Sequence, residues 1–326
     1  MKNRYGLRYL ASLCFLIPLY LIPYTSIAQD DLLKMLDSVP SGEEKHDKVT
    51  ATFKTTKIIS MQTPQTVGKG ELDFRITHRF GSIGEKSGGG VHTLYGWDAI
   101  ADVRFSFDYG ITRKLQVGIA RNKKYENLDG SLKWRFMEQT LSGSVPVTIC
   151  AYSIASLTPM LKSQFYSGAD TAWVSDSAKF IHRMVYTHQV IFARKFAPWL
   201  SIAITPSYTH RNYVLANVNT ANGAVDENGI FSVGTGIRVK VSRSVSILAD
   251  YFYVVSDFRK DNPSMPHYNP LAVGIEIETG GHVFHMNLTN ASGIIENAFI
   301  PNTTDTWTKG GYKFGFNISR VFQVNK

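Results

Sequence analysis

A carboxylate and an imidazole are expected to face each other across one tight hairpin of this sequence. Gly280 and Gly281 fit a two-residue β-turn, which sets Glu276 on one strand opposite His285 on the next. Such a pair could take part in acid–base chemistry, or it could be a polar contact that joins two strands. The spacing predicts the pairing and no reaction, because strand parity and spacing reveal no nucleophile with a neighbouring base.

Charged side chains elsewhere recur at every second position of extended segments, so they share one face of each strand. The side chains assigned to this face, as the lining of a candidate pore, are Arg75, Arg79, Asp102, Arg104, Asp108, Arg135, Arg183, Arg238, Lys240, Asp250, Glu276 and His285. Both signs are interspersed among them. The face is therefore either a solvated conduit or a network of cross-strand pairs that closes the interior, and the sequence favours neither.

Patterns for redox, phosphate or metal chemistry are incomplete. Of the two cysteines, Cys14 leaves with the signal peptide, and Cys150 is interpreted as a small strand residue and not as a redox centre. The segment 84–90 (GEKSGGG) lacks a glycine directly before its lysine, so it is not a phosphate-binding loop. The nine histidines form no H-E-x-x-H motif and have no cysteine partners. We therefore expect no metal and no cofactor.

The sequence also lacks the motif of a hydrolase site that faces lipid. Outer-membrane phospholipases of twelve strands carry a Ser–His pair on one strand, in the order His-x-Ser, and none of the nine histidines is followed in this way. His188 and His210 have the parity of a lipid-facing residue. Their neighbours Tyr186 and Tyr208 place them in an aromatic girdle at the membrane interface. We therefore expect that the protein is not an enzyme.

These residues would be positioned by twelve stretches in which apolar and polar residues alternate, as expected for strands that have one apolar face. The clearest is 72–80, where Asp73, Arg75 and Arg79 alternate with apolar residues, and the fifth is ambiguous. The expected strands are 72–80, 103–109, 115–119, 132–136, 144–156, 184–192, 200–208, 231–241, 245–253, 271–277, 284–288 and 312–322.

The connections between these segments alternate between short and long, and the longest are 157–181, 211–229 and 290–310. An even strand count with short periplasmic turns and long extracellular loops is typical of outer-membrane barrels. The predicted fold class is all-β: a transmembrane antiparallel β-barrel of about 12 strands, with both termini in the periplasm. A soluble all-β domain is the rival, but it would need a second layer over its apolar rows, and no helices supply one.

The beginning of the chain predicts export. Lys2, Arg4 and Arg8 precede an apolar run at 9–22 and a small-residue site that ends at Ala28, which together predict a cleaved signal peptide and a place in the bacterial outer membrane. Without these three residues the net charge falls from +9 to about +6. The charges are spread along strands, so no nucleic-acid partner is expected. The expected partners are outer-membrane lipid and the barrel-assembly machinery.

The predicted organisation is a signal peptide at 1–28, a periplasmic N-terminal arm or plug at 29–67, and an outer-membrane β-barrel at 68–326. In the arm, 30–37 has helical spacing, 41–48 is a charged linker and 49–65 is expected to be extended. The arm could enter the lumen as a plug, or lie at the periplasmic rim, and the rim is slightly favoured. A periplasmic partner for the arm is a further candidate.

Several segments resemble an uncharacterised family of outer-membrane β-barrels. They are 68–76 (GKGELDFRI), 78–81 (HRFG), 109–112 (YGIT), 279–284 (TGGHVF) and 314–322 (FGFNISRVF). The family is the Bacteroidetes barrel family filed as domain of unknown function 5777, and the resemblance spans nearly the whole mature chain. It implies the fold and the compartment, and it supplies no catalytic or ligand residues.

Two classes of function follow from the sequence. The first is a narrow pore or uptake channel for small polar or anionic solutes, which the charged lining would select. The second is a closed scaffold whose loops or periplasmic arm bind a partner. An outer-membrane enzyme is a third and weaker class, because no nucleophile and base pair is evident.

Overall fold

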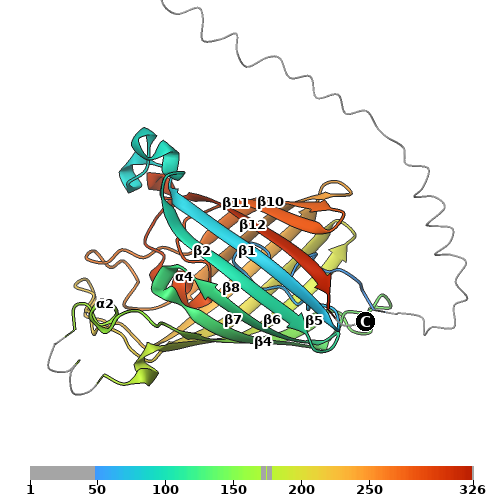
Figure 1. Ribbon diagram of the computed structural model, residues 1–326, viewed down its shortest axis with the longest axis horizontal. Helices are drawn as coiled ribbons and strands as arrows, with labels where there is room; N and C mark the ends of the chain where they lie inside the picture. The colour runs from blue at the N-terminus through green and yellow to red at the C-terminus, as the bar shows by residue number, and fades with distance from the viewer. Residues whose placement is uncertain (1–47, 170–173, 175–177, 325–326) are drawn as a thin grey trace, which may run out of the picture. The chain divides into compact units, whose positions relative to one another are not determined.

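The structure is a computed structural model that describes residues 48–169, 174 and 178–324. In these residues, twelve antiparallel strands form a closed barrel (Figure 1). The strands are β1 (Glu71–Ser82), β2 (Ile100–Gly110), β3 (Leu115–Asn122), β4 (Leu128–Met137), β5 (Thr148–Leu157), β6 (Met184–Ala197), β7 (Leu200–Arg211), β8 (Gly229–Lys240), β9 (Val245–Val255), β10 (Leu271–Thr279), β11 (His282–Thr289) and β12 (Lys313–Gln323). The predicted fold class is confirmed, whereas the proposed signal peptide at 1–28 lies outside the described residues.

The helices are short and lie in the connections. They are α2 (Lys162–Phe165), α4 (Glu296–Asn302) and the 3₁₀ helices η1 (Glu85–Ser87), η2 (Val91–Gly96), η3 (Lys124–Glu126), η4 (Phe180–Arg183) and η5 (Trp307–Lys309). No helix in the described part of the chain is long and apolar enough to cross a membrane.

The barrel closes by pairing its first strand with its last. Ile76 of β1 lies opposite Ile318 of β12, and every other strand pairs with its neighbours in sequence. Closure leaves no strand edge with unpaired backbone groups, which is the condition for a sheet to lie in hydrocarbon. The long connections lie at one end of the barrel and the short turns at the other (Figure 1).

Strand alternation separates the two faces of the barrel wall. On β1 the inward side chains of Asp73, Arg75 and Arg79 are buried, while the residues between them face outward. On the outer face, large apolar side chains such as Ile119 (68 % exposed) and Phe231 (63 % exposed) are uncovered. This surface is the one that faces lipid in a membrane barrel.

Two strands differ from the expected pattern. β4 begins at Leu128, earlier than expected, so the connection from β3 is only five residues long (123–127). The additional strand residues place Asp129 on the face that points into the lumen. On β5 the inward residues include Cys150, Tyr152 and Ile154, which are all buried. Alternation was ambiguous here because the inward face of β5 is largely apolar.

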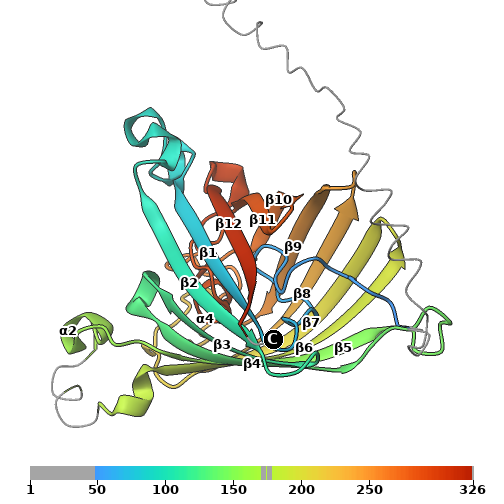
Figure 2. The same cartoon turned by 45° about the vertical axis from the view of Figure 1, so that its right-hand side comes forward.

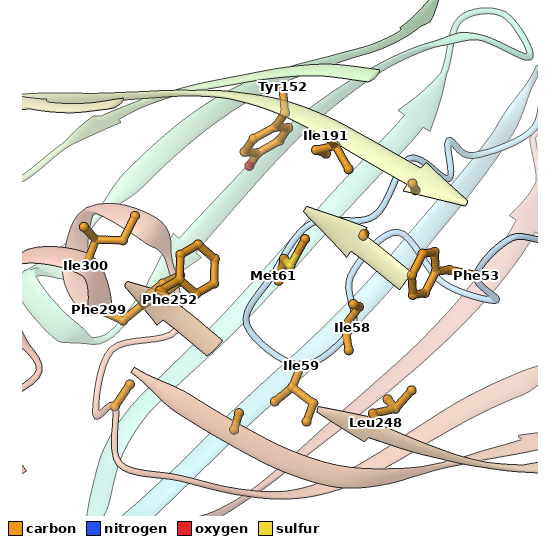
Figure 3. Packing of buried hydrophobic residues seen from close by; sticks show 14 of the residues in the cluster. Phe53, Ile58, Ile59, Met61, Tyr152, Ile191, Leu248, Phe252, Phe299 and Ile300 are labelled. Atoms are coloured by element: carbon orange, nitrogen blue, oxygen red, sulfur yellow. The ribbon is translucent and has the colours of Figure 1, made fainter. Parts of the chain in front are cut away.

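The lumen contains two segments that do not belong to the wall. The first is residues 52–67, the part of the predicted arm that enters the lumen, and "the arm" means these residues from here on. The second is the segment 290–302, which contains α4 and lies between β11 and β12. Phe53, Ile58 and Met61 of the arm join Phe299 of α4 in one buried apolar cluster (Figure 3). The described chain starts at the rim, where Lys48 bridges to Thr140 between β4 and β5, and the blue segment in Figure 2 then enters the ring of strands. This location differs from the rim position that the sequence slightly favoured.

The apolar cluster accounts for the many apolar side chains that one side of the barrel turns inward. The inward residues that contact the two segments come mainly from β5 to β9, which we call the apolar wall. They are Cys150, Tyr152, Ile154, Ile191, Ala193, Ala203, Ile230, Leu248 and Phe252. An open water-filled lumen would expose these side chains to water. Their burial beneath the arm and α4 instead contributes to stability, as in a soluble core.

The fit between the arm and β8 yields a first prediction. A methyl group at Gly236 of β8 would contact Ile58 Cδ1 and would lie 2.9 Å from Met61 Sδ. Gly236→Val should therefore displace the arm at a cost of about 1–3 kcal/mol, as overpacking does in other cores. Faster tryptic cleavage after Lys57 in the refolded protein would report this displacement.

Gly130 on β4 provides the matched control, because nothing lies within 4 Å of a side chain added there. Gly130→Val should leave the rate of cleavage unchanged. Equal cleavage rates in the two variants would show that the arm does not pack against Gly236.

Candidate functional site: the filled lumen

A single buried carboxylate holds the tip of the arm. Asp250 on β9 is 3 % exposed, and its Oδ2 accepts hydrogen bonds from the backbone N–H groups of Ile59 (3.0 Å), Ser60 (2.7 Å) and Met61 (3.2 Å). The arm can present three successive amides because it turns sharply here, with Ile58 N donating to Met61 O at 2.8 Å. Converging backbone amides form an anion-binding nest, and here the anion is part of the barrel wall.

The opposite side of the arm bonds to the strands from β1 to β4, which we call the charged wall. Arg75 donates to Thr56 Oγ1 at 2.9 Å and to Asp73 at 3.0 Å. Lys133 on β4 is also buried, and its Nζ donates to the carbonyl of Thr56 at 2.9 Å. The arm thus supplies oxygen acceptors to both of these buried cations.

Arg79 joins the two segments in the lumen. It is 1 % exposed, and its Nη2 donates to Ser60 Oγ of the arm at 2.8 Å. Its Nη1 donates to the carbonyl of Ala291 at 3.0 Å and to that of Gly293. The guanidinium group of Arg79 therefore joins β1, the arm and the segment before α4. It can do so because its N–H donors point in several directions.

The arm and the α4 segment also contact each other directly. Gln62 Nε2 donates to Glu296 Oε1 at 3.1 Å, and Lys57 Nζ lies 3.9 Å from the same oxygen. Asp102 on β2 holds the other side of this segment by accepting from Ile294 N at 3.2 Å. Both segments are therefore bonded to the wall and to each other.

The charged wall is further neutralised by a pair that the sequence did not reveal. Arg104 on β2 donates to Asp129 on β4, with Nη2 to Oδ1 at 2.8 Å, across the intervening β3. Sequence reasoning missed Asp129 because the expected strand began at residue 132. Extending the alternation from Lys133 back by two pairs of residues would have placed Asp129 on the same face.

The predicted pairing of Glu276 with His285 is confirmed. Glu276 of β10 lies directly opposite His285 of β11, and His285 Nε2 lies 3.2 Å from Glu276 Oε2. Arg238 on β8 donates to Glu276 at 2.8 Å and to Glu278 at 2.9 Å. Because Glu276 is 1 % and His285 2 % exposed, this carboxylate and imidazole are closed off within a structural network.

The remaining residues of the candidate lining fall in different places. Arg135 lies towards the short turns, where it donates to Arg113 O at 2.7 Å and pairs with Glu138. Asp108 and Lys240 are half-buried, on β2 and at the end of β8. Arg183 is not on a strand: it lies in η4, where it donates to the loop carbonyl of Thr158 at 3.0 Å. Its parity could not show that β6 begins one residue later.

The described residues leave little free space in the middle of the lumen and more at one of its ends. Between the arm and the charged wall there is a cavity of about 20 Å³, lined by Lys57, Arg75, Arg104 and their neighbours. This is room for roughly one water molecule. A wider pocket of about 680 Å³ opens at the end with the short turns, between the arm and strands β10, β11, β12 and β1. No group of three or more metal-ligating side chains that could hold an ion occurs in the described part of the chain.

The closed antiparallel barrel and its apolar outer face define this protein as a β-barrel of the outer-membrane type. The chain belongs to the membrane bound beta barrel domain family (DUF5777), whose sequence profile matches residues 53–322. The match begins at Phe53, so it includes most of the arm as well as the wall. No curated protein matches the sequence.

Solved structures of similar fold include porins. The NanC porin is 10 % identical, with a TM-score of 0.45 over 77 % of this chain and 98 % of that one. The KdgM porin is 7 % identical, with a TM-score of 0.40 over 77 % and 99 % of the two chains. Omp33 of Acinetobacter baumannii is 10 % identical, with a TM-score of 0.37 over 80 % and 100 %.

Removing the carboxylate of Asp250 should release the arm. Asp250→Ala would leave three buried N–H groups unsatisfied, and the free energy of holding the arm in place should fall by about 3 kcal/mol. Hydrogen–deuterium exchange at residues 59–61 should then rise by more than tenfold, while exchange in the strands is unchanged.

Asp108→Asn is the matched control for this measurement. Asp108 is also an inward carboxylate, but in the described residues it forms no hydrogen bond to the arm. Exchange at residues 59–61 should stay slow in this variant. Slow exchange in Asp250→Ala as well would show that the carboxylate is not what holds the arm.

Proposed function

We propose that this protein is a barrel closed at rest, in which the arm acts as a plug and the exposed surfaces carry the function. The observation that supports this proposal is that Asp250 and Arg79 bond the arm into the lumen from opposite walls. A solvated conduit needs a continuous water path. The cavity of about 20 Å³ between the arm and the charged wall does not offer one.

The chemistry of the lumen supports closure as the resting state. Breaking a buried ion pair or hydrogen-bonded charge by removing one partner costs about 3–5 kcal/mol. Departure of the arm would leave Asp250, Arg75 and Lys133 without their arm partners and would expose the apolar wall. Water could rehydrate the charges but not the apolar side chains. The arm is therefore favoured inside the lumen.

A second candidate function is a gated passage for small polar or anionic solutes. The observation that favours it is that the arm contacts the charged wall through hydrogen bonds, which water can replace. A path that opened on this side would be lined by Arg75, Arg104 and Lys133, together with Asp73 and Asp129. Such a lining could select anions only where its cations outnumber their acidic partners.

Conductance in a planar bilayer separates an open pore from a closed barrel. The refolded protein that begins at residue 48 should show no steady conductance. A variant that lacks residues 48–65 should conduct steadily, because the lumen between the charged and apolar walls would fill with water. Its reversal potential in a salt gradient would give the ion selectivity.

The control is Arg183→Gln, which changes a basic residue in η4 and leaves the arm contacts intact. This variant, like the parent protein, should show no steady conductance. Circular dichroism should show that the parent, the deletion variant and Arg183→Gln are all folded. Steady conductance by the parent protein would refute closure at rest. Silence of the deletion variant would show that the arm is not the plug.

A further inference from the structure

A groove of about 540 Å³ runs along the outer, lipid-facing surface of the barrel, across strands β4 to β9. Its walls are almost entirely apolar and include Leu132, Trp134, Val190, Pro206 and Phe231. The groove is continuous with the surface that faces lipid in a membrane barrel, so its occupant in the membrane is a lipid chain. Two polar side chains, Ser153 and His188, also line it.

Ser153 and His188 form a hydrogen-bonded pair on this outer surface. Ser153 of β5 lies directly opposite His188 of β6 in the sheet, and Ser153 Oγ lies 2.9 Å from His188 Nδ1. Both side chains face outward from the barrel, whereas the adjacent residues Tyr152 and Gln189 face inward and are buried. A motif on a single strand could not reveal the pair, because its members come from two strands.

The pair leaves one hydrogen-bonding group directed at lipid. If the serine hydroxyl donates to Nδ1, a neutral imidazole carries its proton on Nε2. Within the described residues, His188 has no other hydrogen-bond partner than Ser153. An N–H group with no acceptor is costly in an apolar environment, so a bound acceptor would stabilise it.

The neighbours of the pair are those of a membrane interface. The pair is on the half of the barrel nearer the long connections, beside the aromatic side chains of Tyr186, Tyr208 and Phe231. Tryptophan and tyrosine side chains gather where the hydrocarbon core meets the head groups, which is also where the acyl esters of phospholipids lie. The tyrosines beside the pair therefore support an ester carbonyl as the acceptor for His188 Nε2.

The floor of the groove is shaped by a proline. Pairing between β6 and β7 is regular up to Gln189 with Ser207 and resumes at Phe192 with Ile204. Pro206 lies in this gap and has no N–H group to give to the ladder. Proline and the neighbouring valines give the floor a shallow, apolar shape that fits a hydrocarbon chain.

We propose that this groove is a specific phospholipid site. One acyl chain lies along Val190, Pro206 and Leu132, and its ester carbonyl accepts a hydrogen bond from His188 Nε2. Ser153 is a positioning residue, because it fixes the tautomer and the orientation of the imidazole. The site binds the ester and does not hydrolyse it, since within the described residues no acidic side chain bonds to His188 to support it as a general base.

The test compares two lipids that differ only in the carbonyl. The protein is reconstituted into vesicles of diacyl phosphatidylethanolamine mixed equally with its dialkyl ether analogue, and then extracted gently for native mass spectrometry. The parent protein should retain the diacyl lipid about fivefold more than the ether lipid, the effect of one hydrogen bond of about 1 kcal/mol. Equal retention of the two lipids would overturn the proposal without any mutation.

Variants then identify the donor. His188→Phe should abolish the preference for the diacyl lipid, and Ser153→Ala should weaken it by releasing the imidazole. His78→Phe is the matched control, because His78 is an outward histidine on β1 and does not line the groove. A preference that survives in His188→Phe, or that disappears in His78→Phe, would refute the assignment. Release of free fatty acid by the parent protein would refute binding without hydrolysis.

Discussion

A charged side chain buried in a narrow barrel must have a hydrogen-bonding partner, and much of this structure follows from that requirement. Strand alternation turns Arg75, Arg79, Lys133 and Asp250 inward, and all four are buried. The backbone of their own strands cannot satisfy them, because its N–H and C=O groups are used in the ladder. The arm brings its free amides, carbonyls and hydroxyls to these charges. It is thereby held in place by the lumen that it fills.

The arm also covers the apolar side chains on the other half of the interior. It is therefore amphipathic, although it is neither a regular helix nor a strand. One side of it contributes Thr56 and Ser60 to the charged wall, and the other contributes Phe53 and Met61 to the apolar wall. The two walls therefore depend on a single segment. This explains why β5 can carry inward Cys150 and Ile154 in a barrel whose opposite strands turn charged residues inward.

The outer surface obeys the opposite rule, since lipid offers few hydrogen-bonding groups and polar residues there must satisfy each other. Ser153 and His188 do so across two strands, with one imidazole nitrogen to spare. In the sequence they are 35 positions apart, so a search for a motif within one strand finds neither. The girdle assignment of His188 and the hydrogen bond to Ser153 agree, because both place a polar ring at the membrane interface.

The sequence alone determined the barrel, because alternation, loop length and closure by a final strand are local and repeated signals. It also determined the register of Glu276 with His285, since a two-residue turn fixes the pairing of its strands. The tertiary structure alone decided that the lumen is filled. Nothing in residues 52–67 shows that Asp250, nearly two hundred positions later, accepts their amides, because contacts of this range depend on how the closed barrel brings its walls together.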